Sequence, residues 1–385
     1  MKILIAPDSF KNSLSGPKVA EAIAKGVRSI IEDATIHTLP LADGGEGTVN
    51  ALVASTDGTT RKVRVHDPLM REIEAEYGVI NNDTAIIEMA AASGLELLSE
   101  EERNPMITTT YGTGELIRDA IHNNFRKIII GVGGSATNDA GAGMAEALGA
   151  KLLDKEGRRV DKGGGQLGKI DKIDLSELLP ELKDTNILVA VDVKNTLTGE
   201  EGATRVYSSQ KGANESMVEE LENNLTHFAD LIKSTTGNEI RDIPGSGAAG
   251  GLAGGLNGII GARIENGFNL ISEIIQLEEH LKEADLVITG EGQIDIQTGY
   301  GKTPYGVATM ANNYNVPVVG FAGTLGDRYE TLLQGTFDNL YPITEKPVRL
   351  DEAMHNAEKL LIQAAARMTR SLLIGQQLPK LNVKK

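Results

Sequence analysis

The chain has 385 residues, more than one hydrophobic core usually supports, and with 40% hydrophobic and 24% charged residues it is predicted to be a soluble protein of two domains. Asp and Glu outnumber Lys and Arg by 54 to 38, so the net charge of −16 disfavours nucleic acid and anionic membranes as main partners. The chain has no cysteine, which excludes disulfides, thiolate zinc sites and cysteine nucleophiles.

Two short strands separated by a helix are predicted at the start of the chain. The first strand, Ile3–Ala6, is too short for the apolar core of a signal peptide, and together with the lack of cysteine this predicts a cytoplasmic protein. A helix follows Ser15, and Thr35–Leu39 forms the second strand. The loops after these strands contain Asp8 and Asp43, and open α/β sheets bind their ligands at such carboxyl ends.

The next segment changes to strands without intervening helices. Three strand-like runs follow one another, Arg61–His66, Glu74–Ile80 and Thr84–Met89, which predicts an antiparallel meander. A parallel pattern returns at Asp285–Thr289. We therefore expect a discontinuous parallel-sheet domain of residues 1–60 and 282–385, with an inserted α/β domain of residues 61–281 that contains a mixed sheet.

Hydrophobic periodicity predicts the remaining elements. Helices are expected at Gly114–His122, Ser216–Ile232, Leu270–Leu281, Thr303–Asn313 and Asp351–Ile374. Strands are expected at Lys127–Ile130, Ile187–Val191, Pro317–Phe321 and Asn339–Ile343. The uncharged stretch from 244 to 262 is predicted to be a buried glycine-rich loop and helix rather than a membrane span, because its eight glycines weaken insertion.

The most informative loop follows the strand at Lys127. Three isoleucines lead into Gly131, Gly133 and Gly134, and then into Ser, Ala, Thr, Asn and Asp before a helical pattern. Such a strand, loop and helix can direct backbone N–H groups and the positive end of the helix dipole at one place, so phosphate is the expected ligand. The alternative is an ordinary βα turn whose glycines serve backbone geometry.

Two segments resemble nucleotide-binding motifs. Gly131–Ala136 fits a dinucleotide fingerprint, with Asp154 18 residues further on, so an NAD(P)-dependent dehydrogenase is an alternative function. The polar residues Thr137–Asp139 argue against it, because a fingerprint helix would pack on the sheet there. Gly301-Lys302-Thr303 is not a P-loop, since that motif requires glycine where the chain has Ile296.

Charged side chains beside the loops are candidates for chemistry. Carboxylates that follow predicted strands can bind Mg²⁺ or accept a proton, although any one of them can equally be a capping residue: Asp8, Asp43, Asp192 and Asp295. Lysines beside these loops can neutralise phosphate or carboxylate: Lys11, Lys211 and Lys302. The six histidines show no metal-ligand spacing.

Taken in order, these loops resemble the bacterial type-I glycerate kinase family. The matching segments are Ala6–Lys11, Ala42–Thr48, Gly133–Asp139, Gln210–Ala213, Gly245–Gly251 and Thr289–Asp295, with Gly301 and Lys302. The resemblance implies ATP-dependent phosphorylation of D-glycerate to a phosphoglycerate, with Mg²⁺. It also implies a flavodoxin-like domain with an inserted domain that resembles the restriction-endonuclease-like fold.

Site roles follow from this resemblance and from the needs of phosphoryl transfer. Asp192 is the expected base, Lys11 neutralises phosphoryl or substrate carboxylate, and Asp8 is the third catalytic candidate. Residues expected to bind phosphate or nucleotide are Gly133, Gly134, Ser135, Thr137, Lys211, Gly292 and Lys302. Asp43 and Asp295 are expected near Mg²⁺. The alternatives are the dehydrogenase and a ligand-binding protein without turnover.

Overall fold

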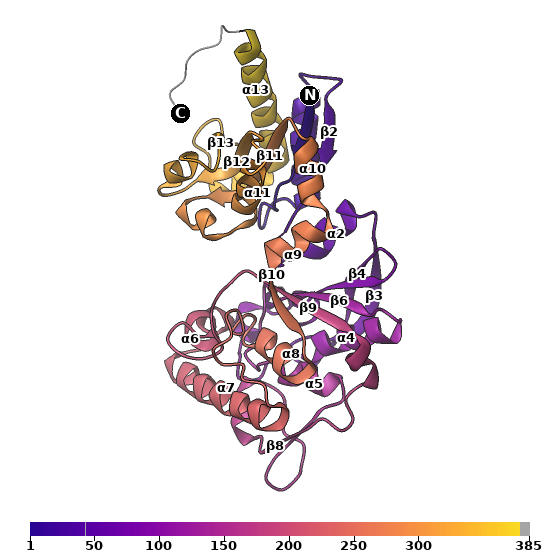
Figure 1. Cartoon of the computed structure of the whole chain (residues 1–385). Helices are drawn as coiled ribbons and strands as arrows, with labels where there is room; N and C mark the ends of the chain where they lie inside the picture. The colour runs from indigo at the N-terminus through magenta and orange to yellow at the C-terminus, as the bar shows by residue number, and fades with distance from the viewer. Residues whose placement is uncertain (43, 378–385) are drawn as a thin grey trace. The chain divides into compact units, whose positions relative to one another are not determined.

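The computed structural model describes residues 1–42 and 44–377, which form two compact units (Figure 1). The parallel unit comprises Met1–Ala42, Asn50–Ser55 and the chain from Ile271 onwards. The mixed unit comprises Asp43–Val49 and Thr56–Leu270. These bounds differ from the expected ones at both ends of the insertion. The short segment ending at Val49 already packs with the mixed unit, and the chain returns to the parallel unit at Ile271, eleven residues before the expected residue 282.

The parallel unit contains a five-stranded sheet in the order β13-β12-β11-β1-β2, in which every pair is parallel. Its strands are β1 (Lys2–Ile5), β2 (Thr35–Thr38), β11 (Leu286–Ile294), β12 (Val318–Leu325) and β13 (Asn339–Pro342). Counted within the unit, the order is 5-4-3-1-2, so the direction of chain progression reverses between β1 and β11. The carboxyl end of such a switch point is the usual ligand position in open α/β sheets.

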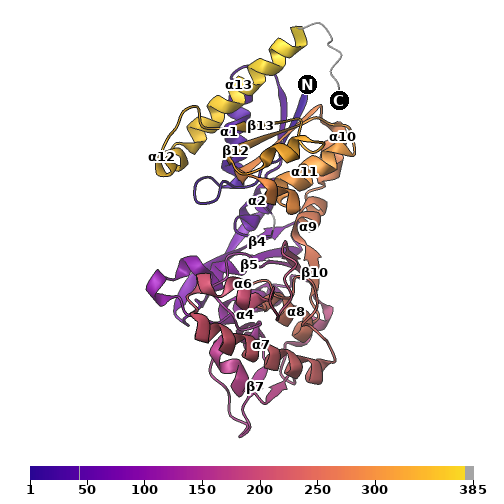
Figure 2. The ribbon, with the colours of Figure 1, turned by 90° about the vertical axis from the view of Figure 1, so that its left-hand side faces the viewer.

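Helices cover both faces of this sheet (Figure 2). α1 (Gly16–Arg28) and α13 (Ala357–Gln377) pack on one face through a common apolar core, and α10 (Leu277–Glu283) and α11 (Thr303–Asn312) lie on the other. The α1–α13 crossing is close, because a Cβ placed on Gly26 would lie 2.4 Å from the carbonyl oxygen of Ile362.

The mixed unit contains a six-stranded sheet in the order β10-β9-β6-β5-β4-β3. Its strands are β3 (Thr59–His66), β4 (Glu72–Ile80), β5 (Thr84–Glu88), β6 (Lys127–Gly131), β9 (Asn186–Val191) and β10 (Arg263–Asn266). β3, β4 and β5 are antiparallel, whereas β5, β6, β9 and β10 are parallel. The predicted meander and the predicted combination of a parallel sheet with a mixed sheet are both confirmed.

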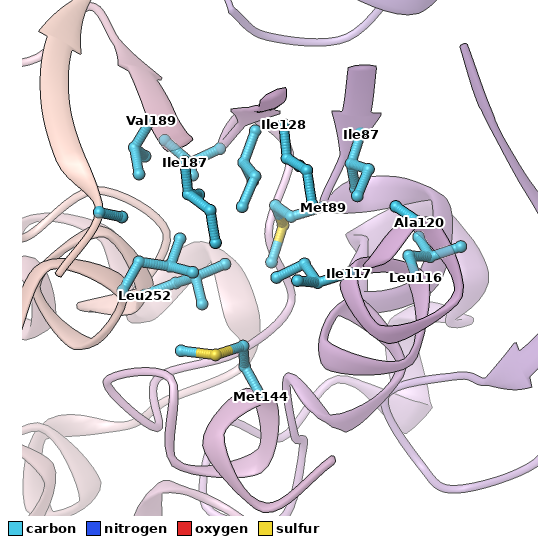
Figure 3. Packing of buried hydrophobic residues seen from close by; sticks show 14 of the residues in the cluster. Ile87, Met89, Leu116, Ile117, Ala120, Ile128, Met144, Ile187, Val189 and Leu252 are labelled. Carbon is cyan, nitrogen blue, oxygen red and sulfur yellow. The ribbon is translucent and has the colours of Figure 1, made fainter. Parts of the chain in front are cut away.

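One face of the mixed sheet is buried under three helices, α4 (Tyr111–His122), α5 (Ala142–Ala147) and α8 (Leu252–Ile260). Figure 3 shows side chains of the sheet meeting those of the helices: Ile87, Ile128, Ile187 and Val189 against Leu116, Ile117, Met144 and Leu252. Each such side chain contributes roughly 1.5–3 kcal/mol through burial. α8 is the buried helix predicted for the glycine-rich stretch, and within the described ranges no helix is long and apolar enough to cross a membrane.

Several predicted elements have different ends. The helix expected over Leu270–Leu281 is two helices, α9 (Gly267–Ile274) and α10, separated by Gln276 in a left-handed conformation with φ 54°. The closing helix is likewise divided into α12 (Leu350–His355) and α13. β11 continues to Ile294 because it pairs with β12 as far as Leu325. The other helices are α2 (Thr48–Ser55), α3 (Ala90–Ser93), α6 (Ala203–Tyr207) and α7 (Glu215–Thr236).

Candidate functional site

In the parallel unit, a buried carboxylate lies near the carboxyl end of β11. Glu291 is 9% exposed; its Oε1 accepts a hydrogen bond from Thr298 Oγ1 at 2.8 Å, and its Oε2 one from Lys302 Nζ at 3.1 Å. Burial raises the pKa of Glu291, and the neighbouring Lys302 and Thr298 oppose that rise. A buried acid paired with a lysine at a switch point has the character of a functional group.

Three predicted residues lie beside this pair. Asp8 follows β1 and is buried; its backbone N–H donates to Gly290 O at 2.9 Å. A Cβ on Gly292 would lie 3.7 Å from the backbone nitrogen of Lys11, so the two segments run side by side. Lys11 is exposed. The structure therefore brings Asp8, Lys11, Gly292 and Lys302 to one edge of the parallel sheet, although Gly292 lies in strand β11 and not in the loop expected there.

Asp295 has a local structural role. It precedes the 3₁₀ turn η6 (Ile296–Tyr300), and its Oδ1 accepts from the N–H of Gln297 at 2.8 Å. Its Oδ2 accepts from Gln293 Nε2 at 2.8 Å, and its own N–H donates to Thr298 Oγ1 at 3.2 Å. The contact with Thr298 Oγ1 and the return contact from the Thr298 backbone N–H to the Asp295 side chain form a capping box. Asp43 lies outside the described residues, and among those described no group of three or more His, Asp or Glu side chains could hold a metal ion.

In the mixed unit, the glycines after β6 are explained by a second loop that crosses them. A Cβ on Gly131 would lie 2.4 Å from the carbonyl oxygen of Gly44, and one on Gly133 would lie 2.6 Å from Gly45 Cα. Gly134 has φ 72°, a left-handed conformation that favours glycine. The crossing loop thus accounts for Gly131 and Gly133, and the backbone conformation accounts for Gly134, so the presence of these glycines alone does not indicate a phosphate.

The expectation that a helix N-terminus points at the ligand is wrong. α5 begins only at Ala142 and has six residues. The buried carboxylate of Asp139 accepts hydrogen bonds from the N–H groups of Gly141 and Gly143, both at 3.2 Å, and from the N–H of Thr110 at 2.9 Å. The first turn of α5 is therefore capped by the protein itself.

The loop between Ser135 and Ala140 is held on several sides. Ala136 donates its N–H to Ser93 O at 2.9 Å and accepts at its carbonyl from Thr108 Oγ1 at 2.8 Å. Asn138 Nδ2 donates to Thr204 Oγ1 at 3.0 Å, and Ala140 N–H donates to Gly250 O at 3.0 Å. A loop fixed by this many partners is preorganised, which is what a binding or catalytic loop requires.

Lys211 meets this loop from inside the unit. It is 1% exposed, and its Nζ donates to Ser135 Oγ at 2.8 Å and to Thr137 O at 2.7 Å. Burial lowers the pKa of Lys211 to about 7, and the nearby Asp139 carboxylate opposes this shift. Ser135, Thr137 and Lys211, three of the predicted phosphate-binding residues, therefore lie together, and all three are buried, with exposed fractions of 7%, 0% and 1%.

Two carboxylates end the strands on either side of β6. Asp192 directly follows β9 and is exposed, and Glu88 is the last residue of β5. Because β6 pairs with both strands, these residues share one sheet edge with the Gly131–Asp139 loop. Glu88 Oε1 accepts from the N–H of Val49 at 2.7 Å, and burial raises its pKa.

Comparison with known proteins assigns the family. The family model described as the glycerate kinase family matches residues 3–373. The chain belongs to this family. It is 47% identical to glycerate 2-kinase of Escherichia coli (strain K12) over 98% of the chain and 99% of that protein, and 45% identical to glycerate kinase of Bacillus subtilis (strain 168) over 98% and 99%. The resemblance stated from the sequence is confirmed.

A solved structure agrees with this family assignment. The crystal structure of a provisionally named glycerate kinase 2 from Salmonella typhimurium LT2 superposes with a TM-score of 0.88 and 46% identity. The match covers 98% of this chain and all of that one, 100%. The α/β architecture with one parallel and one mixed sheet is therefore a fold of the glycerate kinase family.

The geometry also contradicts the dinucleotide alternative. Asp154 accepts hydrogen bonds from the N–H groups of Glu156 and Arg158, both at 2.9 Å, within a turn. The strand before it, β7 (Lys151–Leu153), pairs antiparallel with β8 (Lys172–Asp174) and is not part of the six-stranded sheet. A dinucleotide fingerprint needs its acidic residue at the end of the next parallel strand, so Asp154 cannot bind the ribose.

Sequence reasoning did not single out two residues of these sites, Glu291 and Glu88. Glu291 lies between two glycines in a segment that was expected to be a loop, where an exposed acid is unremarkable. The sequence feature that could have identified Glu291 is its spacing of two residues from Thr289. In a longer strand this spacing places both side chains on the same face. Glu88 is the penultimate residue of a predicted strand, and its hydrogen-bond partner, the N–H of Val49, is distant in sequence.

Proposed function

We propose that this chain is a glycerate kinase that transfers the γ-phosphoryl group of ATP to D-glycerate and releases ADP. The observation that carries this proposal is family membership at 47% identity over nearly the whole chain. The Escherichia coli relative is named a 2-kinase, and on that ground we assign the C2 hydroxyl as the acceptor and 2-phosphoglycerate as the product.

Phosphoryl transfer asks the protein for positioning and charge neutralisation more than for covalent chemistry. In the parallel unit, Lys11 and Lys302 supply positive charge beside Gly292, and Asp8 orients this group of residues. In the mixed unit, the loop containing Gly133, Gly134, Ser135 and Thr137 cradles nucleotide phosphate. Asp192, exposed at the end of β9, orients the attacking hydroxyl and accepts its proton.

Mg²⁺ accompanies ATP in this reaction, where it neutralises charge on the phosphates. Such an ion keeps several waters and is held by phosphate oxygens with one or two carboxylates, so it does not require a complete protein cage. Of the proposed carboxylates, Asp295 has both oxygens in local hydrogen bonds and must give one up to bind the ion.

Two finer assignments are also part of the proposal. The strand order of the parallel unit supports a flavodoxin-like fold, in which strands are arranged 2-1-3-4-5. For the mixed unit we propose kinship with the restriction-endonuclease-like fold, supported by its mixed sheet with helices on one face. We place the reaction in the cytoplasm, where ATP is supplied.

A direct assay tests the function. The purified protein is incubated with D-glycerate, ATP and Mg²⁺, ADP release is followed, and the product is identified by phosphorus NMR. We expect glycerate-dependent ADP and the 2-phosphate ester. ADP release without a phosphoglycerate, or no turnover at any Mg²⁺ concentration, would refute the proposal. Parallel reactions with NAD and NADP measure the competing dehydrogenase activity.

A further inference from the structure

Lys211 is an unusual residue for a protein interior. It ends the 3₁₀ turn η5 (Ser209–Lys211) and is 1% exposed. Burial of an ammonium group is costly, and a leucine or methionine would fill the same volume without that cost. The side chain therefore needs an explanation beyond packing.

The contacts of Lys211 fall on one loop. Nζ donates to Ser135 Oγ at 2.8 Å and to Thr137 O at 2.7 Å, which are the positions on either side of Ala136. The base of the side chain is fixed as well, because Lys211 N–H donates to Ser208 O at 3.0 Å. A Cβ on Gly212 would lie 2.1 Å from Arg103 O, so the turn after Lys211 has little freedom to move.

The amine also determines which way the Ser135 hydroxyl points. A lysine ammonium has three donors and no acceptor, so Ser135 Oγ accepts its hydrogen bond. The hydroxyl hydrogen of Ser135 is then directed away from Lys211 and can be donated to another acceptor, such as a phosphate oxygen. Lys211 is 1% exposed and its Nζ is engaged by the loop, whereas Ser135 retains an exposed fraction of 7%, so the effect of Lys211 on a nucleotide passes through Ser135.

We propose that Lys211 is a positioning residue for phosphoryl transfer, which holds the Gly133–Thr137 loop and orients the Ser135 hydroxyl toward nucleotide phosphate without contacting the phosphate. This inference rests on the proposed function. It replaces the direct phosphate contact expected for Lys211 from the sequence.

The proposal predicts a particular pH dependence. Asp139 is the charged group that faces the amine, and its carboxylate is bonded to Thr110, Gly141 and Gly143. With the pKa of Lys211 lowered to about 7, the amine loses a proton near neutrality. A neutral amine has a lone pair that can accept from the Ser135 hydroxyl, which turns the hydroxyl hydrogen away from the phosphate. The kcat/KM for ATP should therefore fall as pH rises above about 7.

The first test uses variants on both sides of this contact. Lys211→Met keeps the volume and removes the donor, and we expect kcat/KM for ATP to fall about ten-fold or more, as for loss of a charge-assisted hydrogen bond. Ser135→Ala should cost a similar factor, and the double variant should be no worse than the more impaired single variant. Both single variants should lose the decline above pH 7. Lys169→Met, which removes an exposed lysine of the same unit, is the control and should match the wild type.

A second test restores the amine and exploits the absence of cysteine from the chain. Lys211→Cys is unfolded, alkylated with 2-bromoethylamine and refolded, which rebuilds the lysine side chain with sulfur in place of one methylene. Wild-type protein taken through the same steps is the control. We expect activity to return and the decline to move to lower pH, because the sulfur makes the amine less basic.

Defined outcomes overturn the inference. Additive losses in the double variant, or a decline above pH 7 that persists in both single variants, would show that Lys211 does not act through Ser135. Absence of glycerate-dependent turnover in the wild type would instead refute the proposed function. The wild type is assayed before the variants, so the two failures are distinguishable.

Discussion

The glycines of the two sites should respond differently to a single added methyl group. Gly131→Ala places a carbon 2.4 Å from Gly44 O, whereas Gly292→Ala places one no closer than 3.7 Å to its neighbours. An ordinary van der Waals contact of such a carbon is 3.4–4 Å, so the first substitution overlaps its neighbour severely and the second makes an ordinary contact. The neighbour of Gly131 is backbone, which cannot move aside by changing a rotamer.

The expected magnitudes follow from this difference. Overpacking of an interior costs about 1–3 kcal/mol and occasionally more, so Gly131→Ala should lower the free energy of unfolding by about 3 kcal/mol. For a unit of this size that corresponds to a Tm about 6–12 °C lower. Gly292→Ala should change stability by less than about 1 kcal/mol and raise the KM for ATP, because its methyl group occupies the space proposed for phosphate.

Urea unfolding followed by circular dichroism measures the stability of these variants, since the chain has no tryptophan to report by fluorescence. Gly375→Ala is the control: its Cβ meets nothing within 4 Å, and alanine at this exposed position of helix α13 should stabilise by up to about 1 kcal/mol. A Gly131→Ala protein as stable as the wild type would refute the close approach of Gly44. Equal destabilisation by Gly292→Ala would refute the distinction between the packing around these two glycines.

Three further predictions concern charged side chains. Asp192→Asn should lower kcat by about two orders of magnitude or more with unchanged unfolding, and an unchanged kcat would remove Asp192 from the mechanism. Lys11→Ala should weaken glycerate or ATP binding, or slow transfer, without loss of stability because Lys11 is exposed, and steady-state kinetics that match the wild type would contradict its role. Glu291→Gln removes the charged partner of Lys302 and should raise KM several-fold. Burial raises the pKa of Glu291, so the folded protein binds this proton more tightly than the unfolded chain does. The stability of the wild type should therefore decline as pH rises from about 4.3 through the folded pKa. Urea titrations at several pH values should show a smaller decline for Glu291→Gln, and an identical slope would count against the burial argument.

Local patterns were sufficient for the long elements of the fold. The buried strands of both sheets are continuous apolar runs, and the change from strand–helix alternation to consecutive strands near residue 60 indicated the mixed sheet. β8 and β10 were missed because they are three or four residues long and largely polar, so no periodicity identifies them. The interruption at Gln276 was also missed, since nothing in its neighbours' periodicity signals a residue with positive φ.

The sites were harder to predict for a physical reason. The motif at Gly131–Asp139 was identified as important from its own residues, but the cause of its glycines lies at Gly44 and Gly45, almost ninety positions earlier in the chain. The hydrogen-bond partners of Lys211 and Glu88 are also distant in sequence, at Ser135 and Val49, 76 and 39 positions away. A motif indicates where a constrained backbone occurs, whereas the object that constrains it, ligand or protein, is visible only when distant segments are placed together.

The pairing of β1 with β11 has a consequence for the synthesis of this protein. β1 is made first, yet its register partner in the parallel sheet, Leu286–Ile288, leaves the ribosome about 280 residues later. At roughly 5–20 residues per second, one hydrogen-bonding edge of β1 waits for about 15–60 s. During that time the whole chain of the mixed unit is completed, so the unit that is inserted in the sequence can finish folding before the unit that surrounds it.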